Sequence, residues 1–203
     1  MSGPGCPIGA GGLLQQIRNG TPVFVFTEWT LALPNTADAN NKNQHSKWCT
    51  EQIQLANGPV GMQLRIATVG VGGWANLDTD TKLKVDVSTV LGGKVAGVSI
   101  SPLPPNTLLT SAKNQTATIT KSDLKANSFT VDLHTQPVDI WSACVDEKGT
   151  VPAITIQTRL TLIGATHADG TSSGGTVGSS DKTDLQKALG VHFNPVWRQC
   201  TTA

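Results

Sequence analysis

Three of the four cysteines in this chain follow a tryptophan at a distance of three residues or fewer. The pairs are Trp48 with Cys49, Trp141 with Cys144, and Trp197 with Cys200, and the fourth cysteine is Cys6. Each motif holds a single cysteine and no CxxC occurs, so a dithiol redox centre and a zinc ribbon are excluded. Four widely spaced cysteines instead predict two disulfides, for which three pairings are open.

The spacing within each pair decides where the indole rings point. Side chains alternate between the two faces of a β-strand, and every tryptophan–cysteine offset is odd. In a regular strand, each tryptophan would therefore face away from its disulfide, where it is covered by a loop or serves as a ligand platform. A bulge or turn would instead return it to the core, against the disulfide. Both arrangements stay open.

A tryptophan-rich protein of low charge can hold a flat aromatic ligand by ring stacking and apolar burial. We therefore expect a non-enzymatic binding protein with a tryptophan-lined pocket. The predicted ligand-binding residues are Trp29, Trp48, Trp74, Trp141, Trp197 and His192. The alternative is a cell-wall or host-interaction protein whose exposed tryptophans stack on glycans.

Oxygen donors gather in the motif NLDTD, where Asn76, Asp78 and Asp80 occupy alternate positions. This places them on one side of a turn, and oxygen ligands suit Ca²⁺ or Mg²⁺. The glycine and the final glutamate of an EF-hand loop are missing. The three residues are predicted ligands of a calcium or magnesium ion.

The motifs of common hydrolases are absent from the sequence. No G-x-S-x-G elbow occurs, and the histidines form neither HxH nor HExxH. A hydrolase that works with paired carboxylates is the second alternative. The candidate acids lie in predicted strands and are Glu28, Glu51, Asp86 and Asp132. Glu28, with one of the others, is the first choice.

Composition limits the kind of protein that must position these residues. A chain of 203 residues can form one domain with a real core. A net charge of +1 with 14% charged residues argues against nucleic-acid binding. No apolar run approaches the roughly 20 residues of a membrane span. Abundant threonine, valine and glycine are typical of an all-β domain with many turns.

Alternation of apolar and polar residues predicts about nine strands. The clearest segments are 22–33, 49–57, 61–71, 81–91, 94–101, 152–164 and 191–200. We expect a single all-β domain over residues 1–203, built as a two-sheet β-sandwich or jelly roll.

The remaining segments predict connections and one helix. Residues 1–21 form a Gly/Pro-rich N-terminal segment, and the polar residues 34–47 predict a long loop or lid. Residues 164–183 are low in complexity and predict a flexible loop. A short helix is expected over 181–190, with Gly190 as its stop.

An ordered set of motifs resembles a family of small four-cysteine proteins, secreted by fungi and some bacteria, whose function is unknown. The motifs are GCPIG, FVFTEW, WCTEQIQL, WSAC, ITIQTRLTL, SSDKTDL and HFNPVWRQC, and they span nearly the whole chain. The resemblance implies a secreted or cell-wall protein with a disulfide-linked β fold. The opening MSGPGCPIG shows neither the basic start nor the apolar stretch of a signal peptide.

The chain is also similar in size to the pink chromoproteins of oyster mushrooms, which carry an indolone pigment. This resemblance implies a small, indole-like aromatic chromophore as the ligand.

Overall fold

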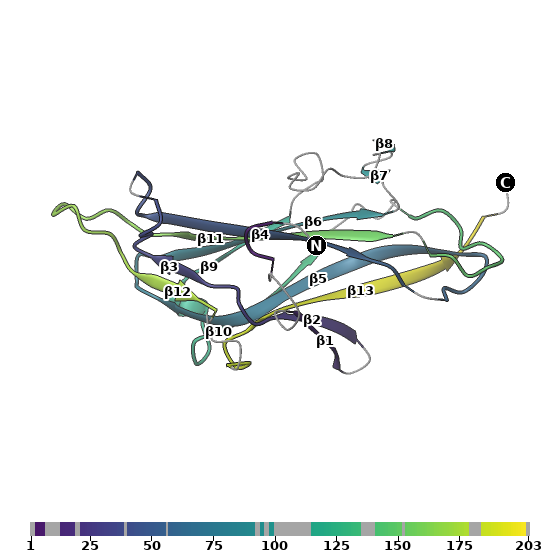
Figure 1. Ribbon diagram of the computed structural model, residues 1–203, viewed down its shortest axis with the longest axis horizontal. Coiled ribbons are helices and arrows are strands. Elements are labelled where there is room, and N and C mark those ends of the chain that lie inside the picture. The colour runs from purple at the N-terminus through teal and green to yellow at the C-terminus, as the bar shows by residue number, and fades with distance from the viewer. Residues whose placement is uncertain are drawn as a thin grey trace.

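The protein is a two-layer β-sandwich (Figure 1). The computed structural model describes residues 3–6, 13–18, 21–38, 40–55, 57–91, 94–95, 98–99, 115–134, 141–151, 153–178 and 184–201. The first sheet contains β1 (Leu13–Arg18), β2 (Thr21–Phe26), β3 (Leu31–Leu33), β5 (Met62–Leu77), β10 (Ser128–His134), β12 (Gly175–Val177) and β13 (Leu189–Gln199). The second contains β4 (Gln44–Ile53), β6 (Lys82–Leu91), β7 (Lys94–Val95), β8 (Val98–Ser99), β9 (Gln115–Ile119) and β11 (Ile154–Ile163).

All the strand pairs are antiparallel, and the long strand β5 organises the first sheet. The order there is β1-β2-β13-β5-β12-β3, and β10 also pairs with β5. In the second sheet the order is β4-β11-β6-β7-β8, and β9 also pairs with β6. Figure 1 shows β4, β11 and β6 in one layer and β5 and β13 in the other. The predicted two-sheet sandwich is confirmed.

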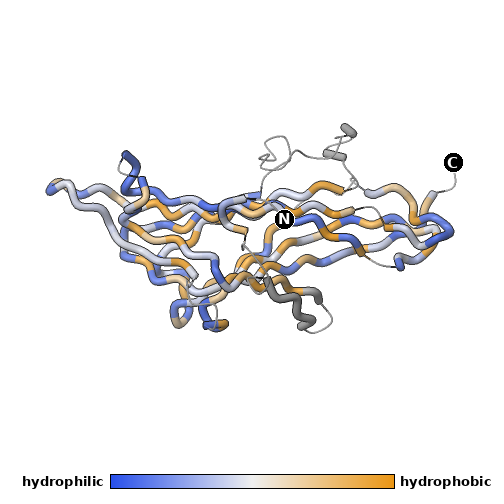
Figure 2. Tube along the Cα trace, in the orientation of Figure 1, coloured by the Kyte–Doolittle hydropathy of each residue, from blue (hydrophilic) through white to orange (hydrophobic). Residues whose placement is uncertain are grey.

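The core lies between the two sheets and follows from the alternation along the strands (Figure 2). In β11, Ile154, Ile156 and Leu160 are fully buried, and Leu64 and Ile66 of β5 belong to the same cluster. Burying one such aliphatic side chain contributes about 1.5–3 kcal/mol. The hydrophobic effect therefore favours this pairing of the two inner faces.

Two disulfides join loops to the sheets, as predicted. Cys6 pairs with Cys49 of β4, and Cys144 pairs with Cys200, which follows β13. The structure thus selects one of the three pairings that the sequence leaves open. Beside the second disulfide, residues 141–145 run along β5, where the Ser142 amide donates to the Leu64 carbonyl at 2.8 Å.

The predicted helix over 181–190 is wrong for the part that the structure describes. Residues 184–187 form a turn, and Leu189 already belongs to β13, where it pairs with Phe26 and is buried. Tertiary pairing of Leu189 outweighs the local helix preference of a single short segment. The described residues contain one 3₁₀ turn, Lys121–Asp123, and among them no helix is long and apolar enough to cross a membrane. Residues 181–183 lie outside the described part.

Three further segments differ from expectation. Strand β4 begins at Gln44, inside the predicted loop 34–47, and β12 forms within the predicted loop 164–183. The segment 22–33 is two strands, β2 and β3, which belong to different parts of the first sheet. Each of these elements forms because a distant strand supplies its partner, which local periodicity cannot report.

Candidate functional site

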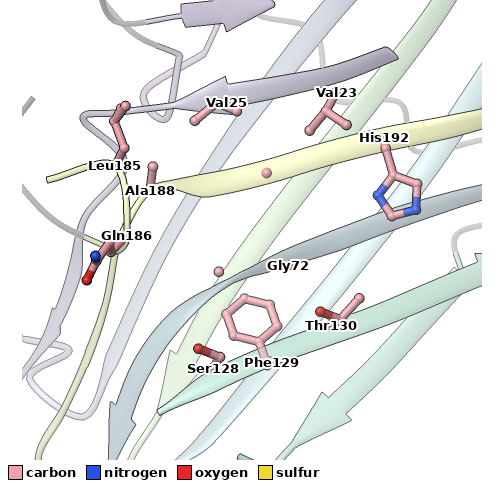
Figure 3. Close-up of a pocket in the computed structure, with 12 residues that line it drawn as sticks. Val23, Val25, Gly72, Ser128, Phe129, Thr130, Leu185, Gln186, Ala188 and His192 are labelled. Carbon is pink, nitrogen blue, oxygen red and sulfur yellow. The ribbon is translucent and has the colours of Figure 1, made fainter. Parts of the chain in front are cut away.

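A groove of about 700 Å³ lies on the outer face of the first sheet, across β2, β13, β5 and β10 (Figure 3). It opens to solvent, and polar and apolar groups share its lining. The lining residues are Val23, Val25, Gly72, Gly73, Ser128, Phe129, Thr130, Leu185, Gln186, Ala188, Gly190 and His192.

The floor of the groove is made of glycine. Gly190 of β13 pairs directly with Gly72 of β5, which pairs on its other side with Thr130 of β10. Since neither glycine carries a side chain, the backbone itself forms the bottom. A Cβ atom built at Gly190 would lie 3.7 Å from the Gly72 oxygen and from Val23, so the floor has room there.

A histidine and an aspartate meet above the next glycine. Along one row across the sheet, Gly70 of β5 stands between His192 of β13 and Asp132 of β10. The His192 Nε2 and Asp132 Oδ1 atoms lie 3.3 Å apart. A Cβ atom at Gly70 would lie 1.9 Å from the His192 Cε1 atom, so only glycine leaves space for this pair.

One wall comes from the turn that precedes β13. Leu185, Gln186 and Ala188 of this turn line the groove, and β13 begins directly after them at Leu189. Within this turn, Lys187 contacts Asp184 at 3.1 Å and lies 5.3 Å from the ring centroid of Trp74. Trp74 follows Gly72 on the same face of β5, because alternate residues share a face. The Trp74 ring therefore lies on the outer face of β5, with the Lys187 ammonium over it, and is not part of the groove lining.

The five tryptophans do not share one pocket among the described residues. Trp29 is buried in the core, Trp197 packs against the core, and Trp48 lies on the face of β4 opposite the buried Cys49. Trp74 and Trp141 lie on the outer face of the first sheet. Of the predicted ligand residues, His192 is the one that lines the groove.

The odd tryptophan–cysteine spacing has different results in the pairs Trp48–Cys49 and Trp197–Cys200. For Trp48 and Cys49 the side chains point to opposite faces, as a regular strand requires. Trp197 points into the core opposite Leu64, and its cysteine lies beyond the end of β13. The glycine floor and the His192–Asp132 pair were not visible in the sequence, because they come from three strands distant along the chain.

The NLDTD motif forms the turn after β5. The Asp78 carboxylate accepts the Gly174 amide at 2.7 Å, and the Thr81 hydroxyl donates to the Gly174 carbonyl at 2.7 Å. Asp78 thus links this turn to the residues before β12. No group of three His, Cys, Asp or Glu residues gathers in the part of the chain that the structure describes. The calcium or magnesium site of Asn76, Asp78 and Asp80 stays a prediction.

The strand carboxylates point in different directions. Glu51 is buried on the core side of β4, Asp86 contacts Lys84 at 3.1 Å on β6, and Asp132 lies on the outer face of the other sheet. Glu28 lies in the turn after β2. Desolvation by burial raises the pKa of Glu51 to about 8.

Fold and site together define a disulfide-linked, all-β protein with an open groove on one sheet face. The chain belongs to the family described as DUF4360, a domain of unknown function, whose model matches residues 1–200. This agrees with the predicted membership in a family of unknown function. The description names no ligand, source organism or pigment.

Other comparisons give only distant likenesses. No curated protein matches the chain. The structure of TmCBM61 in complex with beta-1,4-galactotriose is 9% identical over 98% of this chain and 86% of that chain, with a TM-score of 0.27. A chain in the structure of tobacco necrosis virus is 8% identical over 97% of this chain and 92% of that chain, with a TM-score of 0.23. At these scores, neither likeness bears on function.

Proposed function

We propose that this protein binds carbohydrate in the glycine-floored groove, without catalysing a reaction. One observation carries the proposal: the groove has an apolar side and a polar side that face each other over a flat floor. Val23 and Val25 of β2 form the apolar side, and Ser128 and Thr130 of β10 bring hydroxyl groups from the other side (Figure 3).

A sugar ring matches such a surface. A pyranose presents an apolar face of C–H groups and a rim of hydroxyls that both donate and accept hydrogen bonds. The hydroxyls of Ser128 and Thr130 and the His192–Asp132 pair can form hydrogen bonds with the sugar hydroxyls, because together they offer donors and acceptors. The open side of the groove leaves the remaining hydroxyls in water, so they need no protein partner.

The groove does not suit hydrolysis by paired acids. Such a reaction needs two carboxyl groups that flank the scissile bond. Among the described residues, the lining contains no aspartate or glutamate, and Asp132 stands beside it as a single carboxylate that contacts His192. This supports binding rather than turnover.

The test is a substitution that fills the floor without disturbing the strand. Gly190→Val places two methyl groups in the groove, and valine suits a strand better than glycine. We expect binding in an oligosaccharide panel, measured by titration calorimetry, to weaken at least tenfold, with an unchanged or higher melting temperature. Gln52→Val, on the exposed face of β4, is the matched control and should bind like the wild type. Wild-type affinity in the Gly190→Val protein would refute the proposal.

A small flat aromatic ligand, such as an indole-like pigment, is the second candidate. The groove volume lies within the ~300–1,000 Å³ of small-molecule sites, and Val23 and Val25 give it an apolar side. Protein purified from its natural source would then show a visible absorption band that Gly190→Val removes. A colourless protein that releases no ligand on denaturation would contradict this candidate.

We further propose that the protein works outside the cell or in the cell wall. Two disulfides persist best in an oxidising compartment. Detection with an antibody in the medium or wall fraction would support this location, and recovery from the reducing cytosol with four free thiols would contradict it.

A further inference from the structure

A second polar cluster lies on the same sheet face as the groove. The guanidinium carbon of Arg198 is 4.2 Å from the ring centroid of Trp141, and that of Arg65 is 5.2 Å from it. Two cations therefore share one indole ring. The Arg198 Nε also donates to the Gln63 Oε1 at 3.0 Å, which helps to hold the guanidinium in place.

An irregularity in β5 brings this cluster to the groove side. Arg65 and Gly70 are five residues apart, an odd number that would place them on opposite faces of a regular strand. The pairing with β13 shifts between Asn194 and Pro195, so one extra residue, Ala67, enters β5. Leu64 and Val69 are both in the core, and Arg65 and Gly70 consequently share the outer face.

The chemistry of the cluster suits a carboxylate. Contact with an indole face orients a guanidinium through its π surface rather than through its N–H groups. A planar guanidinium then recognises a carboxylate through two parallel hydrogen bonds. The exposed Arg198 guanidinium, held beside Trp141 and Gln63, gives this end of the face a positive charge that a neutral ligand would not use.

We propose that Arg65, Trp141 and Arg198 form a subsite for the carboxylate of an acidic sugar, so that the ligand is a uronic-acid oligosaccharide lying along β5 and β13. The inference rests on the proposed function of the groove. From Gly72 to Arg65 the strand covers about 23 Å, at roughly 3.3 Å per residue. A short oligosaccharide chain can reach from the glycine floor to the arginines.

The test compares two ligands of the same sugar chain, one with charged carboxylates and one with neutral methyl esters in their place. Hexagalacturonate and its fully methyl-esterified form are titrated into the wild type at low and high salt. We expect the acid to bind about tenfold or more tightly than the ester at low salt, and this preference to shrink as salt screens the charges. Arg198→Gln should reduce the affinity for the acid to that for the ester. Arg159→Gln, on the other sheet, is the matched control and should change neither.

The possible failures separate the two proposals. If both hexamers bind equally and only Gly190→Val weakens them, the arginine subsite is refuted and the groove stands. Acid binding that is lost in Arg198→Gln but unchanged in Gly190→Val would contradict a ligand that spans both. If neither hexamer binds while another glycan does so in the groove, the uronic-acid assignment is wrong.

Discussion

At the scale of single residues, Glu51 is the least expected feature of the interior. Its side chain is on the core face of β4, the residue is only 2% exposed, and neither carboxylate oxygen has a hydrogen-bond partner among the described residues. Burial without a partner favours the neutral acid, because desolvation penalises the charged form. The raised pKa, about 8, means that the folded protein keeps this proton at neutral pH.

This proton links stability to pH. The folded pKa of Glu51 lies above the ordinary value of 4.5, so the folded state binds a proton that the unfolded state has released. The free energy of unfolding should therefore fall as pH rises from about 5 to 8, by several kcal/mol, since one pKa unit corresponds to ~1.4 kcal/mol. Urea unfolding at pH 5, 6.5 and 8 measures this slope.

Glu51→Gln should remove most of that decline, because the amide carries no titrating proton. Glu147→Gln, in an exposed turn, is the control and should keep the wild-type slope. A Glu51→Gln protein with the same pH dependence as the wild type would show that Glu51 does not carry the effect.

Gly70 of β5 and Gly190 of β13 are two glycines on neighbouring strands that differ in the space above them. A methyl group at Gly70 would overlap the His192 ring, whereas one at Gly190 makes only ordinary contacts at 3.7 Å. Gly70→Ala should therefore displace His192 from Asp132 and weaken glycan binding, and Gly190→Ala should leave that pair intact. The His192 side-chain signals in an NMR spectrum report the difference. Unchanged His192 signals in Gly70→Ala would contradict the steric argument.

At the scale of elements, strands with one buried face were the most predictable. The segment 152–164 was expected as a strand and is β11 over Ile154–Ile163, since its apolar side chains meet the core. The short strands β3 and β12 have only three residues each, too few to show a period, and they form between longer partners. A sequence pattern indicates which face of a strand is buried, but it does not indicate which other strand pairs with it.

The extra residue at Ala67 shows the same limit at the site. Simple alternation along β5 would put Arg65 on the core face, opposite the side on which it lies. A bulge depends on the register of two paired strands, which is a property of both. The candidate site was therefore predicted only in part: His192 lines the groove, while the glycines and the arginines were not selected.

At the scale of the whole molecule, the two disulfides restrict the unfolded chain by similar amounts. Their sequence separations are 43 and 56 residues, and loops of this length predict about 4 kcal/mol of stabilisation each in the chain-entropy model. Their surroundings differ, since Cys49 is fully buried and Cys144 is exposed.

Replacing the Cys6–Cys49 pair by alanines should therefore cost more than replacing the Cys144–Cys200 pair. The first change also leaves a cavity in the core, and the second does not. Denaturant unfolding of the two double variants measures the difference. Equal losses would mean that loop closure alone sets the contribution of each bridge.

The sequence by itself determined the fold class, the two disulfides and the strands that bury one face. Composition indicates the fold class, four widely spaced cysteines indicate two disulfides, and alternation along a segment shows which side chains it must bury. Only the tertiary structure decided the disulfide pairing, the direction of each tryptophan and the groove itself. These depend on which strands lie side by side and in what register. Of the three tryptophans in the Trp–Cys motifs, Trp197 packs against the core, while Trp48 and Trp141 lie on outer faces. The groove is built where Gly72 and Gly190 meet across β5 and β13.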